Sequence, residues 1–540
     1  MNIEYDFSSS KNLSFFEKYY PLIKIFEYGD EFILYDAKPH FMFIISNEEL
    51  NVLIDFLTDR PEEEIFITHS TQLNCESVQK LLVKYKGLKD CGTFIKGPAD
   101  EISPVDRDSI KQQLQYFDEN IILRKFCLEV TEDCNYRCTY CRNTLSKEYR
   151  RHSKKYLTED DACSGINYYF KKYIQVASRL PEDKKKLLLQ IVPPGLSWYG
   201  GEPFLNFDLV IKSSEYFKNL PWEKYSIKKS DLRFSINTNL SIMDEKILHF
   251  LVDNNVLLYA SLDGPGEEHD RCRVYENGEG TFSKAYSNLM KIKEFNEHYF
   301  KEKVSIFGVY TQKHDVDRCL DFNSRLGVLN CAHFPAEYTG IFVPDIEAET
   351  EKYNRLIKDN LSDFKNNILS KSENIDNEIN YFSNIFKFSG INYDNPIGNN
   401  SLMTLITCPM GYDNLMVAAN GNFLICHKTD GSMPIGNCRS GLNIEKMTDL
   451  YQRYNGAINN SECRNCWNVR FCEICAARRM TANSFINPSV KECDFLRLRT
   501  KFDFLSFIYL SINHEDMVEK IFNHRNDRTK YISYIDINDL

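Results

Sequence analysis

Hydrophobic positions divide the first 105 residues into strand-like and helix-like stretches. The runs IKIFEYG and EFILYDAKPHFMFIIS are rich in β-branched and aromatic residues, and the helical patterns NEELNVLIDFLTD and SVQKLLVKYKGL follow them. Strands followed by helices predict a small winged-helix-like unit. The next segment, KGPADEISPVDRDSI, carries two prolines and scattered charge, so we expect a linker and a domain boundary near residue 105.

Between about residues 120 and 345, short β-rich runs alternate with helical stretches. A repeated strand, helix, strand order predicts parallel strands, in either a βα barrel or an open α/β sheet. Functional residues of such folds lie at the carboxyl ends of the strands. The expected strands are RKFCLEVT, GLSWYGG, LRFSINTN, LYASLD, VSIFGVYT and AHFPAEY.

The rest of the chain divides by composition. Residues 346–399 are charged and rich in asparagine with helical spacing, so a helical connector is expected there. Residues 400–510 hold a cysteine-rich zone with turn signals between the cysteines, and residues 511–540 are expected to be a polar tail. With 540 residues the chain exceeds one usual hydrophobic core, which favours several domains.

Charge and cysteine content narrow the class of protein. The 43% hydrophobic and 26% charged residues are typical of a globular protein, and a net charge of −11 disfavours a general nucleic-acid groove or an anionic membrane surface. No signal-peptide pattern and no run of about 18 apolar residues is present, so we expect a cytoplasmic protein. In that compartment 18 cysteines indicate metal ligation or redox chemistry rather than disulfides.

The run EDCNYRCTYCRN places Cys134, Cys138 and Cys141 on one tight loop after a strand-like run. Three thiolates can hold three irons of a [4Fe–4S] cluster and leave the fourth iron open, whereas ordinary ferredoxin clusters use four cysteines. Structural zinc is the alternative, but it takes four closed ligands and no histidine lies close by in the sequence. The spacing favours an iron–sulfur cluster with an open iron.

This loop resembles that of the radical S-adenosylmethionine (SAM) superfamily, which has the same cysteine spacing and an aromatic residue, here Tyr140, before the third cysteine. The resemblance implies a partial (β/α)6 TIM-like barrel in which SAM chelates the open iron through its amino and carboxylate groups. Reduction of the cluster would then release a 5′-deoxyadenosyl radical. In such enzymes the protein positions the cofactor, which supplies the difficult chemistry.

Three further motifs follow in the order found in that superfamily. WYGGEP resembles the motif that meets the methionine amino group, where glycine allows close approach and a carboxylate suits an ammonium. FSINTN resembles a ribose-contacting strand, and ASLDGPGEEHDRCR matches a pattern whose arginine suits the SAM carboxylate. Taken alone, each motif is equally consistent with a turn or a satisfied strand-end group. The SAM-contacting residues that the resemblance implies are Tyr140, Gly200, Gly201, Glu202, Ser235, Asn237, Ser261, Asp263 and Arg273.

A second set of cysteines resembles the SPASM domain of peptide-modifying radical SAM enzymes, which carries two auxiliary [4Fe–4S] clusters. Cys472 and Cys475 depart from its pattern, because two residues separate them where the family usually has three. A zinc ribbon is the alternative, since paired cysteines commonly bind Zn²⁺. By the family's interleaved pattern, the first cluster would be held by Cys408, Cys426 and Cys475, and the second by Cys463, Cys466, Cys472 and Cys493.

The resemblance therefore implies three [4Fe–4S] clusters, of which one binds SAM. The first auxiliary cluster would be one ligand short. Either its open iron binds a substrate thiolate or another group, or Cys438 in PIGNCRSG supplies the fourth ligand. The sequence leaves both arrangements open.

Together the three regions resemble a radical SAM/SPASM maturase of ribosomally made peptides. The N-terminal unit resembles the element that captures a leader peptide by strand addition at its sheet edge, although a lid without a partner is an alternative. The resemblance implies hydrogen abstraction from a precursor peptide and a thioether or carbon–carbon cross-link. It also implies a flavodoxin- or ferredoxin-type electron donor, and neither a nucleic-acid nor a membrane partner.

Two other functions stay open. An anaerobic sulfatase maturase, which oxidises Cys or Ser to formylglycine, resembles the core but carries an aspartate where this chain has His427. Histidine can serve as a base near neutral pH. The other alternative is a non-catalytic, zinc-bearing adaptor that binds peptides, in which the WYGGEP and SLDG runs would have no role. The sequence assigns no catalytic acid or base.

Overall fold

The computed structural model describes most of the chain in three stretches with short internal gaps. The helical connector expected at residues 346–399, Cys408, and the tail beyond residue 513 lie outside the described residues. No helix in the described part of the chain combines the length and apolar character needed to cross a membrane. The described ranges are 10–28, 30–96, 106–145, 151–311, 313–335, 410–412, 414–429, 431–458, 461–472, 474–482 and 484–513.

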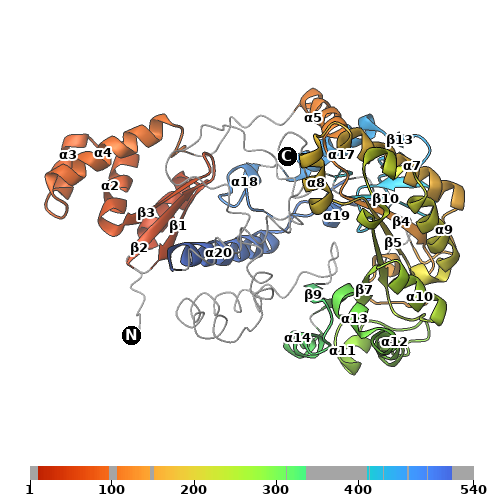
Figure 1. Ribbon diagram of the computed structural model, residues 1–540. Helices are drawn as coiled ribbons and strands as arrows, with labels where there is room; N and C mark the ends of the chain where they lie inside the picture. The colour runs from red at the N-terminus through yellow and green to blue at the C-terminus, as the bar shows by residue number, and fades with distance from the viewer. Residues whose placement is uncertain are drawn as a thin grey trace.

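The N-terminal residues form a three-stranded antiparallel sheet with helices on one side (Figure 1). The run EFILYDAKPHFMFIIS was expected to be one β-rich stretch, but it forms two strands, because a turn at residues 37–40 reverses the chain. A capping box of Ser46 and Glu49 starts the following helix. The elements are α1 (Ser10–Tyr19), β1 (Ile23–Tyr28), β2 (Glu31–Asp36), β3 (Phe41–Ser46), α2 (Asn47–Leu57), α3 (Glu62–His69) and α4 (Cys75–Asp90).

Both faces of this small sheet are covered. In β2, every residue from Phe32 to Asp36 is buried, a pattern typical of a strand with packing on two sides. Ile25 and Leu34 face the core shared with α2 and α4. Phe26 and Tyr35 point to the opposite face, where they contact aromatic rings of the C-terminal region.

A larger sheet contains the six predicted strands in chain order, all parallel. The predicted α/β class with a parallel sheet is therefore confirmed. Its strands are β4 (Lys125–Thr131), β5 (Gly195–Gly200), β6 (Arg233–Thr238), β7 (Leu257–Ser261), β8 (Val304–Tyr310) and β9 (Asn330–Pro335). The accompanying helices are α5 (Arg107–Asn120), α6 (Arg142–Leu145), α7 (Glu159–Ala177), α8 (Glu182–Ile191), α9 (Phe207–Lys218), α10 (Glu245–Asp253), α11 (Gly266–Asp270), α12 (Phe282–Phe295), α13 (Glu297–Lys303) and α14 (Val316–Ser324), with 3₁₀ turns at Pro203–Asn206, Trp222–Tyr225 and Lys229–Asp231.

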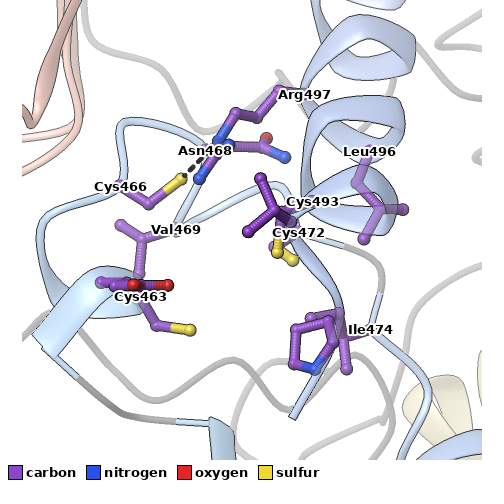
Figure 2. A pocket seen from close by; sticks show the side chains of 12 residues that line it. Cys463, Cys466, Asn468, Val469, Cys472, Ile474, Cys493, Leu496 and Arg497 are labelled. Atoms are coloured by element: carbon purple, nitrogen blue, oxygen red, sulfur yellow. Dashed lines mark hydrogen bonds between the residues drawn. The ribbon is translucent and has the colours of Figure 1, made fainter. Parts of the chain in front are cut away.

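The C-terminal region extends this sheet and then returns to the N-terminal unit. β10 pairs in parallel with β4, so β4 is an interior strand although it comes first in the α/β region. Helix α20, the last helix of the described residues, begins beside the loop that holds Cys466 (Figure 2) and runs along the N-terminal sheet (Figure 1). The elements are β10 (Asn414–Val417), β11 (Asn422–Leu424), β12 (Gly436–Asn437), β13 (Gly441–Leu442), α17 (Ile444–Ile458), α18 (Ser461–Arg464), α19 (Ala476–Arg479) and α20 (Val490–Asn513).

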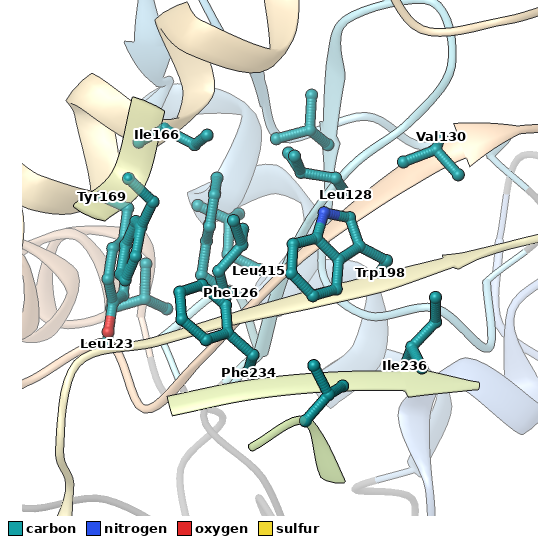
Figure 3. Close-up of a cluster of buried hydrophobic side chains, with 14 of the residues drawn as sticks. Leu123, Phe126, Leu128, Val130, Ile166, Tyr169, Trp198, Phe234, Ile236 and Leu415 are labelled. Atoms are coloured by element: carbon teal, nitrogen blue, oxygen red, sulfur yellow. The ribbon is translucent and has the colours of Figure 1, made fainter. Parts of the chain in front are cut away.

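Side chains alternate between the two faces of the parallel sheet, and one face is tightly packed while the other is half-buried. Trp198, Phe234 and Ile236 pack on one face, where the rings of Trp198 and Phe234 stack at 5.5 Å (Figure 3). Ser197 and Ser235 lie on the other face and are only half-buried. The polar strand residues predicted from the sequence therefore belong to the less tightly packed face.

Candidate functional site

The three-cysteine loop follows β4 directly, at the carboxyl end of the sheet. Two of its backbone N–H groups bind the segment after α11: Arg137 donates to the carbonyl of Val274 (2.7 Å) and Thr139 to that of Cys272 (2.9 Å). These two hydrogen bonds hold the cysteine loop, which follows β4, against the segment that follows α11. The predicted ligands on it are Cys134 and Cys138, both buried, and Cys141, which is half-buried.

Gly200 and Gly201 allow the end of β5 to contact the start of this loop. A Cβ atom on Gly201 would lie 2.1 Å from the carbonyl oxygen of Asp133, and one on Gly200 would lie 2.3 Å from that of Thr131. Gly200 also has a φ of +152°, which favours glycine. The N–H of Gly201 donates to Thr131 and that of Glu202 to Asp133. The close approach in this structure is thus to the cysteine loop.

Glu202 is fully buried and holds the ends of two strands together. Its carboxylate accepts hydrogen bonds from the Phe204 N–H (3.1 Å), the Thr238 hydroxyl (2.9 Å) and the Asn239 N–H (2.7 Å). Burial raises the pKa of Glu202 from 4.5 to about 7, against the opposing effect of these donors. A nearby cation, such as an ammonium group, would restore the charged form.

Glu202→Gln is expected to change how the stability of the iron-free protein depends on pH. Because the folded-state pKa is raised from 4.5 to about 7, the folded chain holds this proton more tightly than the unfolded chain. The contribution of Glu202 to stability is therefore complete below the unfolded pKa and is lost as the pH rises through 7, by up to about 3 kcal/mol. Since glutamine does not titrate, the stability of the wild type relative to the variant should fall from acidic to alkaline pH in thermal unfolding. A difference that stays constant over that range would contradict this assignment.

Two side-chain donors face the sulfurs of the loop. The amide of Asn239 lies 3.6 Å from the Cys134 Sγ, and the Arg273 guanidinium lies 3.9 Å from the Cys138 Sγ. Burial raises the pKa of the Cys134 thiol to about 12, and it raises that of Cys138 as well. Donors and a positive charge favour the thiolate form, which is the form that ligates metal. The donor set therefore suits an anionic iron–sulfur cluster.

Asp263 connects two other predicted SAM-contacting residues, Tyr140 and Arg273. Its carboxylate accepts from the Tyr140 hydroxyl (2.6 Å), from Arg273 Nε (2.9 Å) and from the Val309 N–H (2.9 Å). Burial disfavours the Asp263 carboxylate, but the Arg273 charge and these donors hold its pKa below the ordinary value. The structure thus places Arg273 between Asp263 and the cysteine loop.

The other predicted SAM contacts lie on the half-buried face of the sheet. Ser235 exchanges a hydrogen bond with Ser197 of the neighbouring strand at 2.7 Å. Asn237 shares the face of Ser235 two residues further along β6, and Ser261 ends β7 as a half-buried residue. These residues approach the carboxyl end of the strands, the same end as the cysteine loop.

A second cysteine region reaches this half-buried face. The ring of His427 lies 4.9 Å from that of Tyr199 on β5, and Cys426 precedes His427 in the chain. Burial raises the pKa of Cys426 to about 11, and Cys475 adds to the rise while Arg142 opposes it. Cys426 therefore lies near Cys475 and near Arg142, the residue that follows Cys141.

Cys438 packs in a different place. Its Sγ lies 3.5 Å from Asp161 Oδ1 of α7 and next to Gly421. Burial and the Asp161 carboxylate raise the pKa of the Cys438 thiol to about 11. The structure thus engages Cys438 with a carboxylate, and Cys408 lies outside the described residues.

Four predicted ligands of the second auxiliary cluster line one cavity (Figure 2). Arg497 of α20 donates from Nε to the Cys466 Sγ at 3.4 Å. Burial, reinforced by the neighbouring cysteines, raises the pKa of Cys472 to about 12. The cavity measures about 280 Å³, far more than the roughly 15 Å³ that one water needs. Its cysteines are Cys463, Cys466, Cys472 and Cys493.

No three His, Cys, Asp or Glu side chains within the described ranges converge closely enough to hold a single metal ion. The sulfurs of a tetrahedral zinc site lie about 3.8 Å apart. The cavity of about 280 Å³ gives the four cysteines around it room for a group larger than one metal ion.

Sequence reasoning missed three residues that contact these sites. Asn239 is the last residue of FSINTN, and its position directly after β6 was the available signal. His269 lies in the run ASLDGPGEEHDRCR and accepts a hydrogen bond from the Asp263 N–H at 3.3 Å. Arg497 lies in the run LRLRTKFDFLSFIYLSI, and nothing in the apolar pattern of that run marks it.

Comparison with known proteins identifies the α/β unit. A family model described as the radical SAM superfamily matches residues 128–322, which run from β4 into α14. The chain is a radical SAM enzyme. The resemblance drawn from the Cys134–Cys141 loop is therefore confirmed. SAM and a [4Fe–4S] cluster are the cofactors that this family implies.

Curated relatives of this radical SAM enzyme include two kinds of named protein. The radical SAM cyclopropyl synthase TigE of Paramaledivibacter caminithermalis is 24% identical over 380 residues, covering 68% of this chain and 70% of TigE. A cysteine-type anaerobic sulfatase-maturating enzyme of Clostridium novyi is 27% identical over 172 residues. That match covers 31% of this chain and 40% of the maturating enzyme, so it is confined to part of each.

Two solved structures illustrate the range of structural similarity. SuiB of Streptococcus suis bound to precursor peptide SuiA has 14% identity and a TM-score of 0.44, covering 88% of this chain and 99% of that one. The structure of native anSMEcpe with bound AdoMet has 18% identity and a TM-score of 0.49, covering 72% of this chain and 99% of that one.

Proposed function

We propose that this radical SAM enzyme modifies a ribosomally made precursor peptide by hydrogen abstraction, forming a thioether or carbon–carbon cross-link. The observation that carries the proposal is the contact between His427 and Tyr199, which brings the second cysteine region onto the half-buried face of the sheet. A peptide on that face would reach both cysteine regions. The relation to a cyclopropyl synthase over 68% of the chain favours a carbon–carbon bond.

The residues of the first loop fit a cluster that binds SAM. Cys134, Cys138 and Cys141 would hold it, and when bound it supplies a 5′-deoxyadenosyl radical. Asn239 and Arg273 stabilise the thiolates. Glu202, Ser235, Asn237 and Ser261 supply polar groups around the same end of the sheet, where they would bind and orient SAM.

The C-terminal cysteines fit auxiliary clusters, as in a SPASM domain. The four cysteines around the 280 Å³ cavity would hold the second cluster. Cys426 and Cys475, with Cys408, would hold the first. The contact between Cys438 and Asp161 supports leaving the fourth position of that cluster to another group.

The N-terminal unit fits a docking element for the leader peptide. Within the described residues β3 pairs only with β2, so its other edge presents backbone donors and acceptors. Ile44 of β3 is 41% exposed. An extended peptide that adds to this edge would gain main-chain hydrogen bonds and an apolar contact.

Co-expression tests the proposal. The enzyme is produced with each short open reading frame that flanks its gene, and the peptides are examined by tandem mass spectrometry. A cross-linked peptide that has lost two hydrogen atoms supports the proposal. An aldehyde captured by a hydrazide probe would instead support the sulfatase-maturase alternative. Unmodified peptides, together with no SAM cleavage, would support the adaptor.

Arg497→Leu is expected to lower the midpoint potential of the second auxiliary cluster by roughly 50–100 mV. The substitution removes a positive charge and an N–H donor from the Cys466 sulfur, and both favour the reduced, more negative cluster. A redox titration monitored by electron paramagnetic resonance measures the shift. Lys491→Leu, at an exposed cation on the same helix, is the control and should leave the potential near that of the wild type. Equal potentials in wild type and Arg497→Leu would refute the assignment.

A further inference from the structure

The loop between Cys466 and Cys472 contacts two parts of the molecule, the cavity of the four cysteines and the N-terminal unit. Cys466, Val469 and Cys472 line the cavity of the four cysteines. Trp467 and Phe471, placed between them in the chain, are 7% and 4% exposed and contact aromatic rings of the N-terminal unit instead. A stretch of five residues between two candidate ligands thus carries an interface with a unit more than 400 residues earlier in the sequence.

Arg470 joins this loop to the turn between β2 and β3. Its Nε donates to the carbonyl of Ala37 (2.5 Å) and its Nη2 to that of Lys38 (2.6 Å). The turn is itself held by Asp36, a buried carboxylate that accepts from the N–H groups of Lys38 and Phe94. The two acceptors of Arg470 are therefore fixed within the N-terminal unit.

Aromatic packing extends the same interface to α20. Phe26 of β1 stacks on Phe504 at 4.8 Å and meets Trp467 edge-on at 5.4 Å. Tyr35 of β2 contacts Phe471 at 5.2 Å and Phe504 at 5.6 Å. All five rings are buried, so separating the N-terminal sheet from the loop would expose a large apolar surface.

We propose that docking of the N-terminal unit holds the Cys466–Cys472 loop in the conformation in which its cysteines face the cavity. A ligand that displaces this unit would then alter the cysteine site, and filling of the site would in turn stabilise the docked unit, because such coupling is reciprocal. The inference rests on the proposed ligand role of the four cysteines. It adds that the proposed peptide-binding unit and the proposed cluster site both contact the Cys466–Cys472 loop, so a change in this loop would affect both.

Alkylation of the iron-free, full-length protein tests the coupling. Arg470→Ala is expected to raise the rates at which a maleimide labels Cys466 and Cys472 by at least ~10-fold, because the loop opens more often without its anchor. Phe26→Leu, on the other side of the interface, should raise the same two rates. Peptide mapping by mass spectrometry gives each rate. Unchanged labelling of Cys134 would show that the α/β unit stays folded.

Matched controls separate docking from local damage. Phe43→Leu changes a ring on the opposite face of the same small sheet, and Arg325→Ala removes an exposed arginine paired with Asp321. Both should label as the wild type does. The proposal is overturned if Arg470→Ala leaves both rates unchanged, or if Arg470→Ala acts and Phe26→Leu does not, since the loop would then be held by Arg470 alone.

The ligand role is measured separately, by counting iron and sulfide after anaerobic reconstitution. Coupled labelling rates in a protein whose iron content does not depend on Cys463 and Cys493 would leave the coupling standing and remove the proposed cluster. Labelling rates that do not change in the variants, together with an iron content that depends on Cys463 and Cys493, would overturn the coupling and leave the proposed cluster standing.

Discussion

Replacing Cys134, Cys138 and Cys141 together by alanine is expected to reduce 5′-deoxyadenosine formation from SAM to the level without enzyme, a loss of at least ~1000-fold. The protein contributes binding and orientation, whereas bond cleavage needs the cluster that these thiolates would hold. Product is quantified by chromatography after anaerobic reconstitution, with SAM and dithionite added. Iron content should fall by about four ions per chain while the C-terminal sites stay loaded.

The matched control replaces three cysteines elsewhere. Cys75 and Cys91 are exposed in or next to a helix of the N-terminal unit, and Cys163 is half-buried on α7. The triple alanine variant of these residues should cleave SAM at the wild-type rate. Wild-type protein that contains iron and sulfide but forms no 5′-deoxyadenosine would contradict the proposed use of the loop.

Gly201→Ala is expected to lower 5′-deoxyadenosine formation nearly as much as the triple cysteine substitution does, although it changes no cysteine. A Cβ atom there would lie 2.1 Å from the carbonyl oxygen of Asp133. Because this oxygen belongs to the backbone and cannot rotate away as a side chain could, the cysteine loop and the end of β5 must move apart. Overpacking of this kind costs about 3 kcal/mol of unfolding free energy. A displacement of about 1 Å at the reacting groups can cost ~100-fold in rate. Thermal unfolding and 5′-deoxyadenosine formation measure the two effects.

Gly87→Ala provides the opposite case. Gly87 lies inside α4 and a Cβ there would meet nothing within 4 Å, so the substitution should raise stability by roughly 0.5–1 kcal/mol with activity unchanged. If Gly201→Ala retains wild-type SAM cleavage, the packing of β5 against the loop is not needed for activity.

The parallel sheet could be predicted because its strands are short apolar runs separated by helical patterns. Each of the six expected runs coincides with a strand from β4 to β9. The sequence did not show that β2 and β3 are two separate strands, because the apolar pattern continues on both sides of the Lys38–Pro39 turn. The pairing of β10 with β4 could not be foreseen, since no local signal reports a partner so distant in sequence.

The cysteine sites were predictable as sets, and their surroundings were not. The interleaved pattern of the family that the sequence resembles grouped Cys463, Cys466, Cys472 and Cys493, and the structure brings these four to one cavity. The donors that face the sulfurs come from other elements, so spacing carries no information about Asn239 or Arg497. The two glycines of WYGGEP were linked to cofactor binding, which stays a prediction, and the structure adds a close contact of these glycines with backbone atoms of Thr131 and Asp133.

The position of β4 inside the sheet has a consequence for synthesis of the chain. Leu128 pairs with Val417, about 290 residues later, so at roughly 10 residues per second about half a minute separates their exit from the ribosome. During that interval one edge of β4 presents unpaired backbone groups to any passing strand. The nascent protein therefore carries an aggregation-prone edge beside the newly made cysteine loop until its C-terminal quarter arrives.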